Sequence, residues 1–341
     1  MSHPHPWMPV SPCGAGCLPA ADAVPVVGRA SRLLRLLAVT VTLLAGVALA
    51  VGFPWLRPAD RKRTLRAWSG MLLKALRIQL VVTGGDRFGP TGVGVLVVSN
   101  HLSWLDLVVL SAVQPLHMVA KSEVRTWPVI GLLARRADTV FMDRERLSAL
   151  PQAVATVSGA LASGATIGVF PEGTTWCGRA SGRFRPALFQ AAVDTGTPVR
   201  PVALGYRLAG IGTTTVASFV GSTTLWESVM LVAGVRGLVV DVHLLPLLPS
   251  DGLNRRALAA GAQAAVTAAA PTLRSGEVDP GRGRHLQPPP RHPGPRRSTP
   301  AVRLRPGRDA LQHIEVLMTS AGAVELPIFH QRPALGSLRR C

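Results

Sequence analysis

The hydrophobic pattern divides the chain into an apolar N-terminal part, an alternating central part and a Pro/Arg-rich end. From Val93 to about Pro249, short apolar runs of strand length alternate with segments of helical pattern. This alternation predicts an α/β domain with a largely parallel central sheet flanked by helices. The predicted strands are Val93–Ser99, Leu116–Ala120, Thr139–Met142, Thr166–Phe170, Val199–Leu204 and Leu238–Leu244. The predicted helices are Trp104–Val113, Leu147–Ser163, Ala187–Thr195 and an Ala-rich helix over 251–270.

The segment before these strands is first apolar and then amphipathic. Leu33 to Leu56 is apolar apart from Arg35 and two threonines, and its part from Leu36 to Trp55 has the roughly 20 residues that a membrane-spanning helix needs. The next stretch, Arg61 to Leu80, has the pattern of a helix with one apolar and one basic side, which is typical of a helix lying in a membrane interface. The sequence therefore predicts an N-terminal hydrophobic and amphipathic helical membrane anchor.

Three arrangements of this anchor are open. The first helix could span the membrane, with the basic cluster of the second keeping the downstream chain cytoplasmic. The two helices could instead form a hairpin that dips into one leaflet, bent at Gly52 and Pro54. The third arrangement is a cleaved signal peptide, whose N-terminal region would be longer than usual.

These segments give four predicted parts. Residues 1–30 are expected to be disordered, 31–80 to anchor the chain to a membrane, 81–270 to form the catalytic domain, and 271–341 to form a disordered Pro/Arg-rich tail. The chain has a formal net charge of +19, and the part from Pro271 onwards alone holds twelve arginines and five acidic residues. Aromatic residues make up 5% of the chain, with one tyrosine, which argues against a stacking platform for single-stranded nucleic acid. Positive charge beside a hydrophobic anchor favours a membrane surface as the partner.

The four cysteines do not indicate a disulfide framework. Cys13 and Cys17 lie in the irregular N-terminus, Cys177 lies alone in the central part, and Cys341 is the last residue. A C-x3-C pair without companion ligands does not predict a metal site, and this cysteine usage fits a reducing compartment. We therefore expect no metal.

Polar motifs follow four of the predicted strands. His101 comes after the first strand, Lys121 after the second, Asp143-Arg144 after the third and Glu172-Gly173 after the fourth. In parallel sheets, ligands bind beyond the carboxyl ends of the strands. The four motifs are therefore expected to meet at one edge of the sheet.

His101 and Asp106 are the candidate catalytic pair at this edge. His101 falls in a strand-to-helix turn, and Asp106 falls in the first helical turn, with Ser103 as the expected N-cap. A carboxylate beside an imidazole fixes its tautomer and raises its basicity, as a general base requires. Taken alone, the same residues better fit a surface histidine next to a helix-capping aspartate.

The other motifs have simple structural readings as well. Phe170 to Thr175 ends a strand in a Gly-containing turn that presents N–H groups and a carboxylate, although an ordinary β-turn would look the same. Arg144 offers a planar fork for phosphate or carboxylate, or forms only a surface pair with Asp143. Lys121 is either a second cation facing the site or a solvated lysine. The strand Val199–Leu204, with its early Pro201, is also explained by core packing.

Taken together and in this order, the four blocks resemble those of the glycerolipid acyltransferase family, the 1-acylglycerol-3-phosphate acyltransferases. The first family block is matched by His101-x4-Asp106 and the second by residues Phe141–Arg144. The third is matched by Phe170–Thr174 and the fourth by Val199–Leu204. The resemblance extends from about Arg61 to Pro249.

The resemblance implies an O-acyltransferase that moves a fatty acyl group from acyl-CoA or acyl-carrier protein to a lysolipid hydroxyl at the cytoplasmic membrane, with no metal or redox cofactor. By this likeness His101 would deprotonate the hydroxyl and Asp106 would orient the imidazole. Anionic headgroup contacts would come from Lys121 and Arg144. The remaining substrate contacts implied by the family blocks are Glu172, Gly173, Thr174 and Pro201.

Two departures from the family pattern bear on the acceptor. Many members have arginine after Glu-Gly-Thr, where this chain has Thr175, although the next loop could supply the charge from Arg179, Arg183 or Arg185. Glycine often stands where this chain has Asp138, which would bring a carboxylate near Arg144. The main expectation is 1-acylglycerol-3-phosphate as acceptor, giving phosphatidic acid. The alternative is a phosphate-free lysolipid such as lyso-ornithine lipid.

Two further hypotheses compete with acyl transfer. A thioesterase would need Ser103 or Ser99 as nucleophile, and the sequence has no G-x-S-x-G elbow. A basic membrane-binding protein without catalysis would use the Arg/Pro tail as its contact.

Overall fold

A mixed eight-stranded sheet forms the centre of the fold. The computed structural model describes residues 9–127, 129–143 and 146–275, and all that follows refers to these residues. The strand order is β1-β8-β6-β2-β5-β3-β4, with β7 paired to β6. The strands are β1 Gln79–Thr83, β2 Val95–Ser99, β3 His117–Lys121, β4 Val140–Met142, β5 Thr166–Val169, β6 Val199–Leu208, β7 Gly212–Thr213 and β8 Leu238–Leu244.

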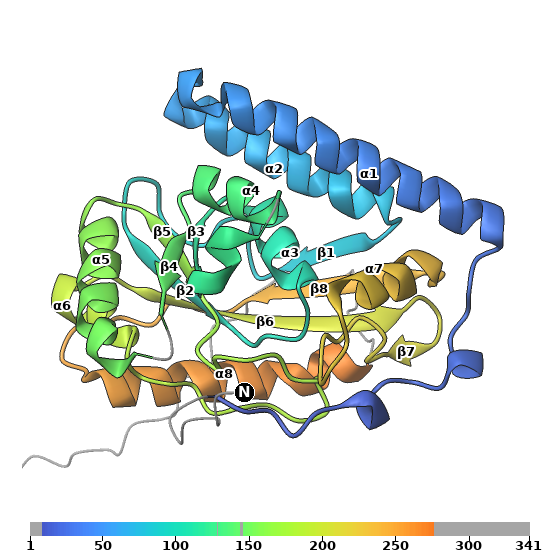
Figure 1. Cartoon of the computed structure of the whole chain (residues 1–341). Helices are drawn as coiled ribbons and strands as arrows, with labels where there is room; N and C mark the ends of the chain where they lie inside the picture. Colours follow the sequence, from blue (N-terminus) through green and yellow to red (C-terminus); the bar gives the residue numbers. More distant parts are fainter. Residues whose placement is uncertain (1–8, 128, 144–145, 276–341) are drawn as a thin grey trace, which may run out of the picture. The chain divides into compact units, whose positions relative to one another are not determined.

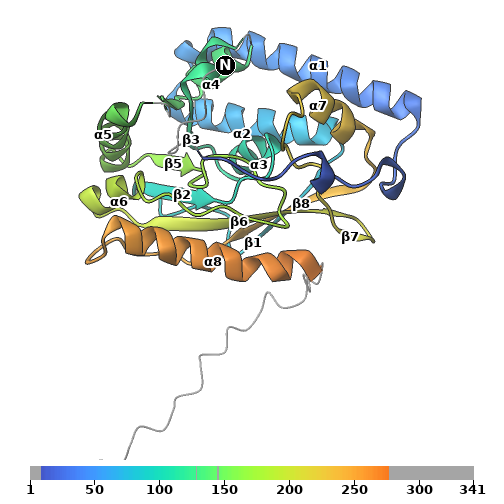
Figure 2. The ribbon, with the colours of Figure 1, turned by 60° about the horizontal axis from the view of Figure 1, so that its bottom comes forward.

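Helices cover both faces of this sheet (Figures 1 and 2). They are α1 Arg29–Gly52, α2 Pro58–Ala75, α3 Leu105–Val113, α4 Ile130–Arg136, α5 Leu150–Ala162, α6 Phe189–Thr195, α7 Leu225–Gly234 and α8 Arg255–Ser275. The alternation along β2 separates two cores. Val95 and Val97 pack with residues of α2, α3 and α7, whereas Leu96 and Val98 pack with residues of α5, α6 and α8. Both faces of β2 are thus covered, which explains why its sequence is a continuous apolar run.

The predicted α/β class is confirmed, and the strand directions refine it. Strands β6, β2, β5, β3 and β4 are parallel, as expected for the part of the sheet that carries the motifs. Strand β8, however, is antiparallel to β6, and β1 runs parallel to β8. The direction of β8 is set by its long-range partner β6, which the local hydrophobic pattern does not encode.

The prediction of one helix over Arg61–Leu80 is wrong at its end. Helix α2 stops at Ala75, and Arg77 takes a left-handed conformation with φ of 57°. The chain then enters β1, whose residues include two adjacent valines. Helices α4 and α7 were not predicted, although Thr224 and Glu227 form a complete capping box at the start of α7.

Helices α1 and α2 form an antiparallel hairpin (Figure 1). The lack of a side chain at Gly46 allows the close approach of the two helices, since a Cβ there would lie 2.5 Å from Nε1 of Trp68. The Trp68 indole donates to the carbonyl of Thr42 at 2.8 Å. A 3₁₀ turn, Phe53–Trp55, reverses the chain, and Arg61 donates to the carbonyls of Leu56 and Pro54 at 3.0 and 2.8 Å. Local hydrogen bonds therefore fix the tip of the hairpin.

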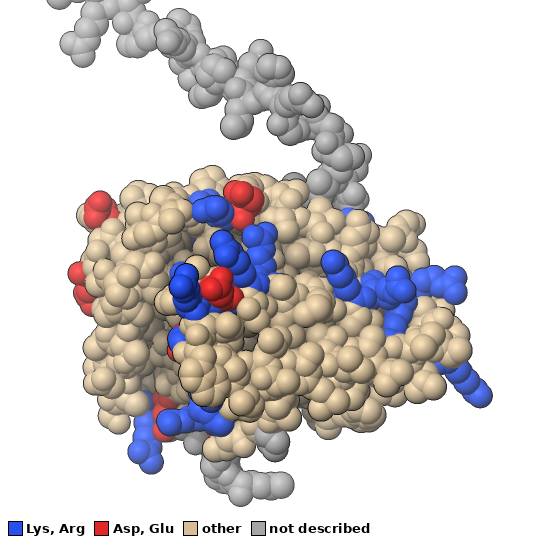
Figure 3. All heavy atoms as spheres, turned by 90° about the horizontal axis from the view of Figure 1, so that it is seen from above, with Lys and Arg blue, Asp and Glu red and all other residues tan. Residues whose placement is uncertain are grey.

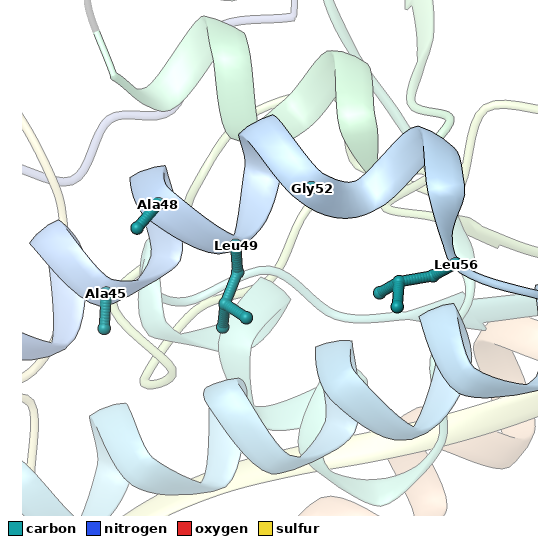
Figure 4. A pocket seen from close by; sticks show the side chains of 5 residues that line it. All are labelled: Ala45, Ala48, Leu49, Gly52 and Leu56. Carbon is teal, nitrogen blue, oxygen red and sulfur yellow. The ribbon is translucent and has the colours of Figure 1, made fainter.

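The outer side of the hairpin is apolar and exposed. The segment Arg29–Trp55 is long and apolar enough to cross a membrane by length and composition, and 17% of its apolar window is buried. Near the tip, a hollow of about 490 Å³ is lined by Ala45, Ala48, Leu49, Gly52 and Leu56. Figure 4 shows Leu49 projecting toward the neighbouring helix and the side chain of Leu56 extending along the hairpin in the direction of Leu49.

Residues 9–28, for which disorder was predicted, form an irregular segment with two short 3₁₀ turns that contacts distant parts of the chain. Val26 forms a β-bridge with Val235, Val27 N donates to the carbonyl of Gly234 at 2.8 Å, and Cys13 is buried. Apolar contacts and backbone pairing with distant parts of the chain order this segment, so its own low periodicity is uninformative. The predicted disordered tail falls outside the described residues from residue 276 onward.

Candidate active site

The end of β2 is tied to β6 by an asparagine that takes the place of backbone pairing. The Asn100 amide donates to the carbonyl of Leu204 at 2.9 Å and accepts from its N–H at 2.8 Å. These two bonds continue the β2–β6 ladder with a side chain. They fix the position at which the chain leaves the sheet, and His101 is the next residue.

His101 and Asp106 lie together as predicted. His101 Nδ1 is 2.9 Å from Asp106 Oδ2, and the Asp106 side chain is fully buried. The same Oδ2 accepts the backbone N–H groups of Leu102 at 2.6 Å and Ser103 at 2.9 Å. Because a carboxylate accepts from Nδ1, this nitrogen carries the hydrogen, and Nε2 presents the lone pair of the neutral ring.

The helix start differs from the predicted one by one residue. Helix α3 begins at Leu105, and its N-cap is Trp104 rather than Ser103. The Ser103 hydroxyl still accepts from the N–H of Leu105 at 3.3 Å, and the Asp106 carboxylate accepts from the preceding turn. Asp106 therefore caps the turn and orients His101 at the same time, so the two functions are not alternatives.

The imidazole ring is held from a second side by stacking. The rings of His101 and Phe170 are 3.9 Å apart between centroids and inclined by 7°. Phe170 directly follows β5, so the strand next to β2 contributes one wall of the site. The His101 side chain keeps 18% of its exposure. A substrate can therefore reach the ring, while rotation of the ring is restricted.

Glu172 supports the histidine through the backbone. Its Oε2 accepts from His101 N at 2.7 Å and its Oε1 accepts from Gly182 N at 2.8 Å. The side chain is buried, and burial raises the pKa of the Glu172 carboxyl to about 7; the two hydrogen bonds lower it in part, and the charge of Asp106 raises it. Both oxygens are engaged in holding the loop, so the predicted headgroup contact by Glu172 stays a prediction.

The rest of this loop packs around the same turn. Trp176 N donates to the carbonyl of His101 at 2.8 Å, and Gly173 has φ of 76°, a conformation that favours glycine. The Thr175 hydroxyl donates to the carbonyl of Phe219. Thr175, at the position where many family members have arginine, thus links the loop after Glu172 to the segment around Phe219.

Tyr206 was missed by the sequence analysis. The only tyrosine of the chain is buried on β6, and its hydroxyl donates to Asp106 Oδ1 at 2.6 Å. Burial, together with the charge of Asp106, raises the pKa of Tyr206 well above its ordinary value, so the hydroxyl keeps its proton. The predicted strand ended at Leu204. Extending its alternation by one step would have placed Tyr206 on the α3 side of the sheet.

The other predicted site residues lie at different depths. Lys121 ends β3 at the same sheet edge and is exposed. Thr174 is half-buried in the Glu172 loop. Pro201 lies inside the sheet level with Val98 and is buried. Arg144 lies outside the described residues. The structure thus brings His101, Asp106, Glu172 and the Gly173 turn together.

A cavity opens beside this cluster, toward α8. It has a volume of about 420 Å³ and is lined in part by Asn100, Leu102, Glu172, Tyr206 and, from α8, Val266. On the face seen from above in Figure 3, Lys and Arg gather in separate groups with uncharged surface between them. The site therefore adjoins a cavity lined by both polar and apolar residues.

Comparisons with known proteins agree with this geometry. A family model described as Acyltransferase matches residues 80–205. A Lyso-ornithine lipid O-acyltransferase of Pseudomonas aeruginosa is 37% identical over 70% of this chain and 90% of that protein. A 1-acyl-sn-glycerol-3-phosphate acyltransferase of Neisseria gonorrhoeae is 39% identical over 44% of this chain and 58% of that protein. The crystal structure of the 1-acyl-sn-glycerophosphate acyltransferase PlsC from Thermotoga maritima has the same fold, with a TM-score of 0.57 and 21% identity over 71% of this chain and 94% of that chain.

Proposed function

The chain belongs to the glycerolipid acyltransferase family, and on this premise we propose that it transfers a fatty acyl group from a thioester to the hydroxyl of a lysolipid, with His101 as general base. The observation that carries the assignment is the His101–Asp106 pair, 2.9 Å apart, with a fully buried carboxylate at the end of β2. The donor is acyl-CoA or acyl-carrier protein.

The proposed reaction is a single displacement. Nε2 of His101 takes the proton of the acceptor hydroxyl as its oxygen attacks the thioester carbonyl. The new C–O bond forms, the C–S bond breaks, and the imidazolium returns its proton to the departing thiolate. No acyl-enzyme is required.

Asp106 stabilises the imidazolium that forms in this step. Its carboxylate is held by the two backbone N–H groups of the turn and by Tyr206, so its position does not change as the charge on His101 appears. A fixed dipole or charge aimed at a developing charge lowers the barrier without reorganisation.

For the acceptor, the proposal is a phosphate-free lysolipid, with lyso-ornithine lipid first. The Pseudomonas aeruginosa relative with that name is matched over 90% of its length, whereas the Neisseria gonorrhoeae relative named for 1-acyl-sn-glycerol-3-phosphate is matched over 58%. Thr175 has no positive charge that could bind a phosphate, and its hydroxyl donates a hydrogen bond to the carbonyl of Phe219. The second candidate, 1-acylglycerol-3-phosphate, rests on Lys121, which lies exposed at the same sheet edge.

For the anchor, the proposal is a hairpin inserted in one leaflet on the cytoplasmic side. The first half of α1 is tied to the domain, because Arg32 donates to the carbonyl of Met230 at 2.7 Å and Arg35 to that of Val235 at 2.6 Å. A helix held in this way keeps its apolar outer side beside the catalytic domain. A lysolipid lies in the bilayer, so this anchor would hold the site where its acceptor is.

The test offers the purified full-length protein radiolabelled acyl-CoA or acyl-carrier protein together with mixed micelles of detergent and one lysolipid. We expect a labelled diacyl product with lyso-ornithine lipid at a rate about tenfold or more above that with 1-acylglycerol-3-phosphate, a difference of ~1.4 kcal/mol in transition-state binding. The reverse preference would overturn the acceptor assignment. Free fatty acid released at the same rate without lysolipid would favour a thioesterase, and absence of turnover with every pair would favour a binding protein.

A further inference from the structure

Three cysteines that are far apart in the sequence meet beside the active-site loop. The sulfurs of Cys13, Cys17 and Cys177 all lie within 4.8 Å of one another. Cys13 and Cys177 are buried and Cys17 is half-buried. Cys13 and Cys17 lie four positions apart, and the fold brings Cys177 to them from 160 residues further along the chain.

The backbones that carry the three thiols are held in place independently of the sulfurs. A 3₁₀ turn, η1 Ala15–Cys17, folds Cys17 back toward Cys13, with Cys17 N donating to the carbonyl of Gly14 at 2.9 Å. The carbonyl of Cys17 accepts from the Thr215 hydroxyl at 2.6 Å. The carbonyl of Cys177 accepts from the Ser218 hydroxyl at 3.1 Å. One short segment, 215–218, therefore positions both sides of the cluster.

From this arrangement we propose that Cys13, Cys17 and Cys177 bind a zinc ion. Zinc takes thiolate ligands at about 2.3 Å in tetrahedral geometry, which places the sulfurs about 3.8 Å apart, within the spacing found here. A disulfide would use two of the three sulfurs and leave the convergence of the third unexplained. Three thiolates leave the fourth zinc position for water on the half-buried side of Cys17. Binding releases one proton from each thiol, three in all.

The ion would fasten the N-terminal segment across the loop that supports His101. A Cβ at Gly173 would lie 2.7 Å from Cγ of Pro9, and a Cβ at Gly221 would lie 3.1 Å from Cα of Gly14. Cys177 follows Trp176, whose N–H donates to the carbonyl of His101. The zinc site would thus join residues 9–17 to the Glu172 loop, with a structural effect on the site and no part in the chemical step.

The test measures metal on the full-length protein purified without chelators under reducing conditions. We expect about one zinc per chain by mass spectrometry of the metal. We also expect a thiolate-to-cobalt charge-transfer band when Co²⁺ replaces it, and release of three protons per Zn²⁺ added to the metal-free protein in weak buffer. Cys177→Ser should lower the affinity for Zn²⁺ by more than the roughly 10–100-fold that loss of a supporting contact costs. Cys341→Ser is the matched control, since it removes the remaining cysteine of the chain, and it should bind as the unmodified chain does.

Cys17→Ser provides a second variant, because its half-buried position makes misfolding less of a concern than at Cys177. A chelator should lower the melting temperature of the unmodified chain and of Cys341→Ser, and leave that of Cys17→Ser unchanged. The assignment would be overturned if the reduced protein takes up neither Zn²⁺ nor Co²⁺, if Co²⁺ binds without a charge-transfer band, or if Cys341→Ser loses metal as the other variants do. A stable disulfide within the cluster in the freshly purified protein would also overturn it. None of these readouts depends on acyl transfer.

Discussion

The described part of the chain contains two histidine–aspartate pairs, and they lie at opposite edges of the sheet. His101 and Asp106 meet at the carboxyl end of β2, with 2.9 Å between Nδ1 and Oδ2. His117 opens β3 at its amino end, and its Nδ1 is 3.9 Å from Oδ2 of Asp138. The two pairs contain the same residue types, yet only the first has the geometry of a hydrogen bond.

The difference lies in what surrounds the carboxylate. The Asp106 side chain is fully buried and accepts from two backbone N–H groups and from Tyr206, whereas the Asp138 side chain is 67% exposed. An exposed ion pair contributes little because water screens it. A histidine beside an aspartate is therefore a candidate base only where the fold fixes the carboxylate by other contacts.

The backbone conformation at Asp138 also bears on which residue can stand there. The sequence departs there from the glycine of many family members, and its φ of 51° is a left-handed conformation that favours glycine and is tolerated by aspartate. The carboxylate lies against His117. Its expected partner Arg144 lies outside the described residues.

The largest effect is expected from His101→Ala compared with His117→Ala. Loss of the base at the β2 end should lower kcat/KM for lysolipid acylation by about 10⁴-fold or more, because no other group replaces Nε2. His117→Ala should stay within about twofold. Initial rates measure both effects, and circular dichroism shows whether the fold is kept. If His101→Ala retains more than a few per cent of the activity, the assignment of the base is wrong.

Asp106→Asn compared with Asp138→Asn separates the two carboxylates. An amide at residue 106 places an NH₂ group where the backbone N–H groups of the turn need an acceptor. It also no longer fixes which nitrogen of the His101 ring carries the hydrogen, so kcat should fall by about 10³-fold. The unsatisfied buried groups should also lower the free energy of unfolding by about 1–3 kcal/mol. Asparagine tolerates the backbone of residue 138, and neither kcat nor the urea midpoint should change there. Equal effects in the two variants would contradict the distinction.

Glu172 should make stability depend on pH. Burial raises its pKa from 4.5 to about 7, so the protonated form is favoured in the folded state. The stability that this form contributes is complete below about pH 4.5 and is lost as the pH rises through 7, with a total of about 3 kcal/mol.

The measurement is the melting temperature of the unmodified chain relative to Glu172→Gln between pH 4.5 and 8. The melting temperature of the unmodified chain should fall relative to that of Glu172→Gln as the pH rises over this range, and the difference should become constant above pH 7. Glu123→Gln, at an exposed carboxylate, should show no such trend. A flat difference for Glu172→Gln would mean that this carboxyl does not titrate in the range.

The smallest effect is expected from Tyr206→Phe. It removes one of the donors to Asp106 and keeps the ring that packs in the core, so kcat should fall about tenfold with KM unchanged. The unfolding free energy should fall by roughly 1 kcal/mol, because one buried oxygen loses its partner. Denaturant unfolding and steady-state rates measure both. A change confined to KM would indicate that Tyr206 acts on substrate binding and not through Asp106.

The sequence alone determined the features that depend on local pattern. Apolar runs of strand length gave six of the strands within a few residues of their observed bounds, and one of these six, β8, has the predicted ends. Polar residues directly after those runs gave His101, Asp106 and the Glu172 turn, since a strand end fixes the edge at which its next residues lie. An apolar segment followed by an amphipathic one, with Gly52 and Pro54 between them, gave the hairpin as one of the open arrangements.

Tertiary structure alone decided the features that join distant residues. Tyr206 reaches Asp106 across 100 positions, Asn100 pairs with Leu204 across 104, and Cys177 joins Cys13 and Cys17 from across the domain. The directions of β1 and β8 were decided in the same way, by their pairing with each other and with β6. The hydrophobic period of a strand or helix depends on neighbouring residues and can be recognised from the sequence. The partner of a buried hydroxyl or thiol depends on how the completed elements pack. For this reason the His101–Asp106 pair was predictable from the sequence, whereas the contacts of Tyr206 with Asp106 and of Asn100 with Leu204 were not.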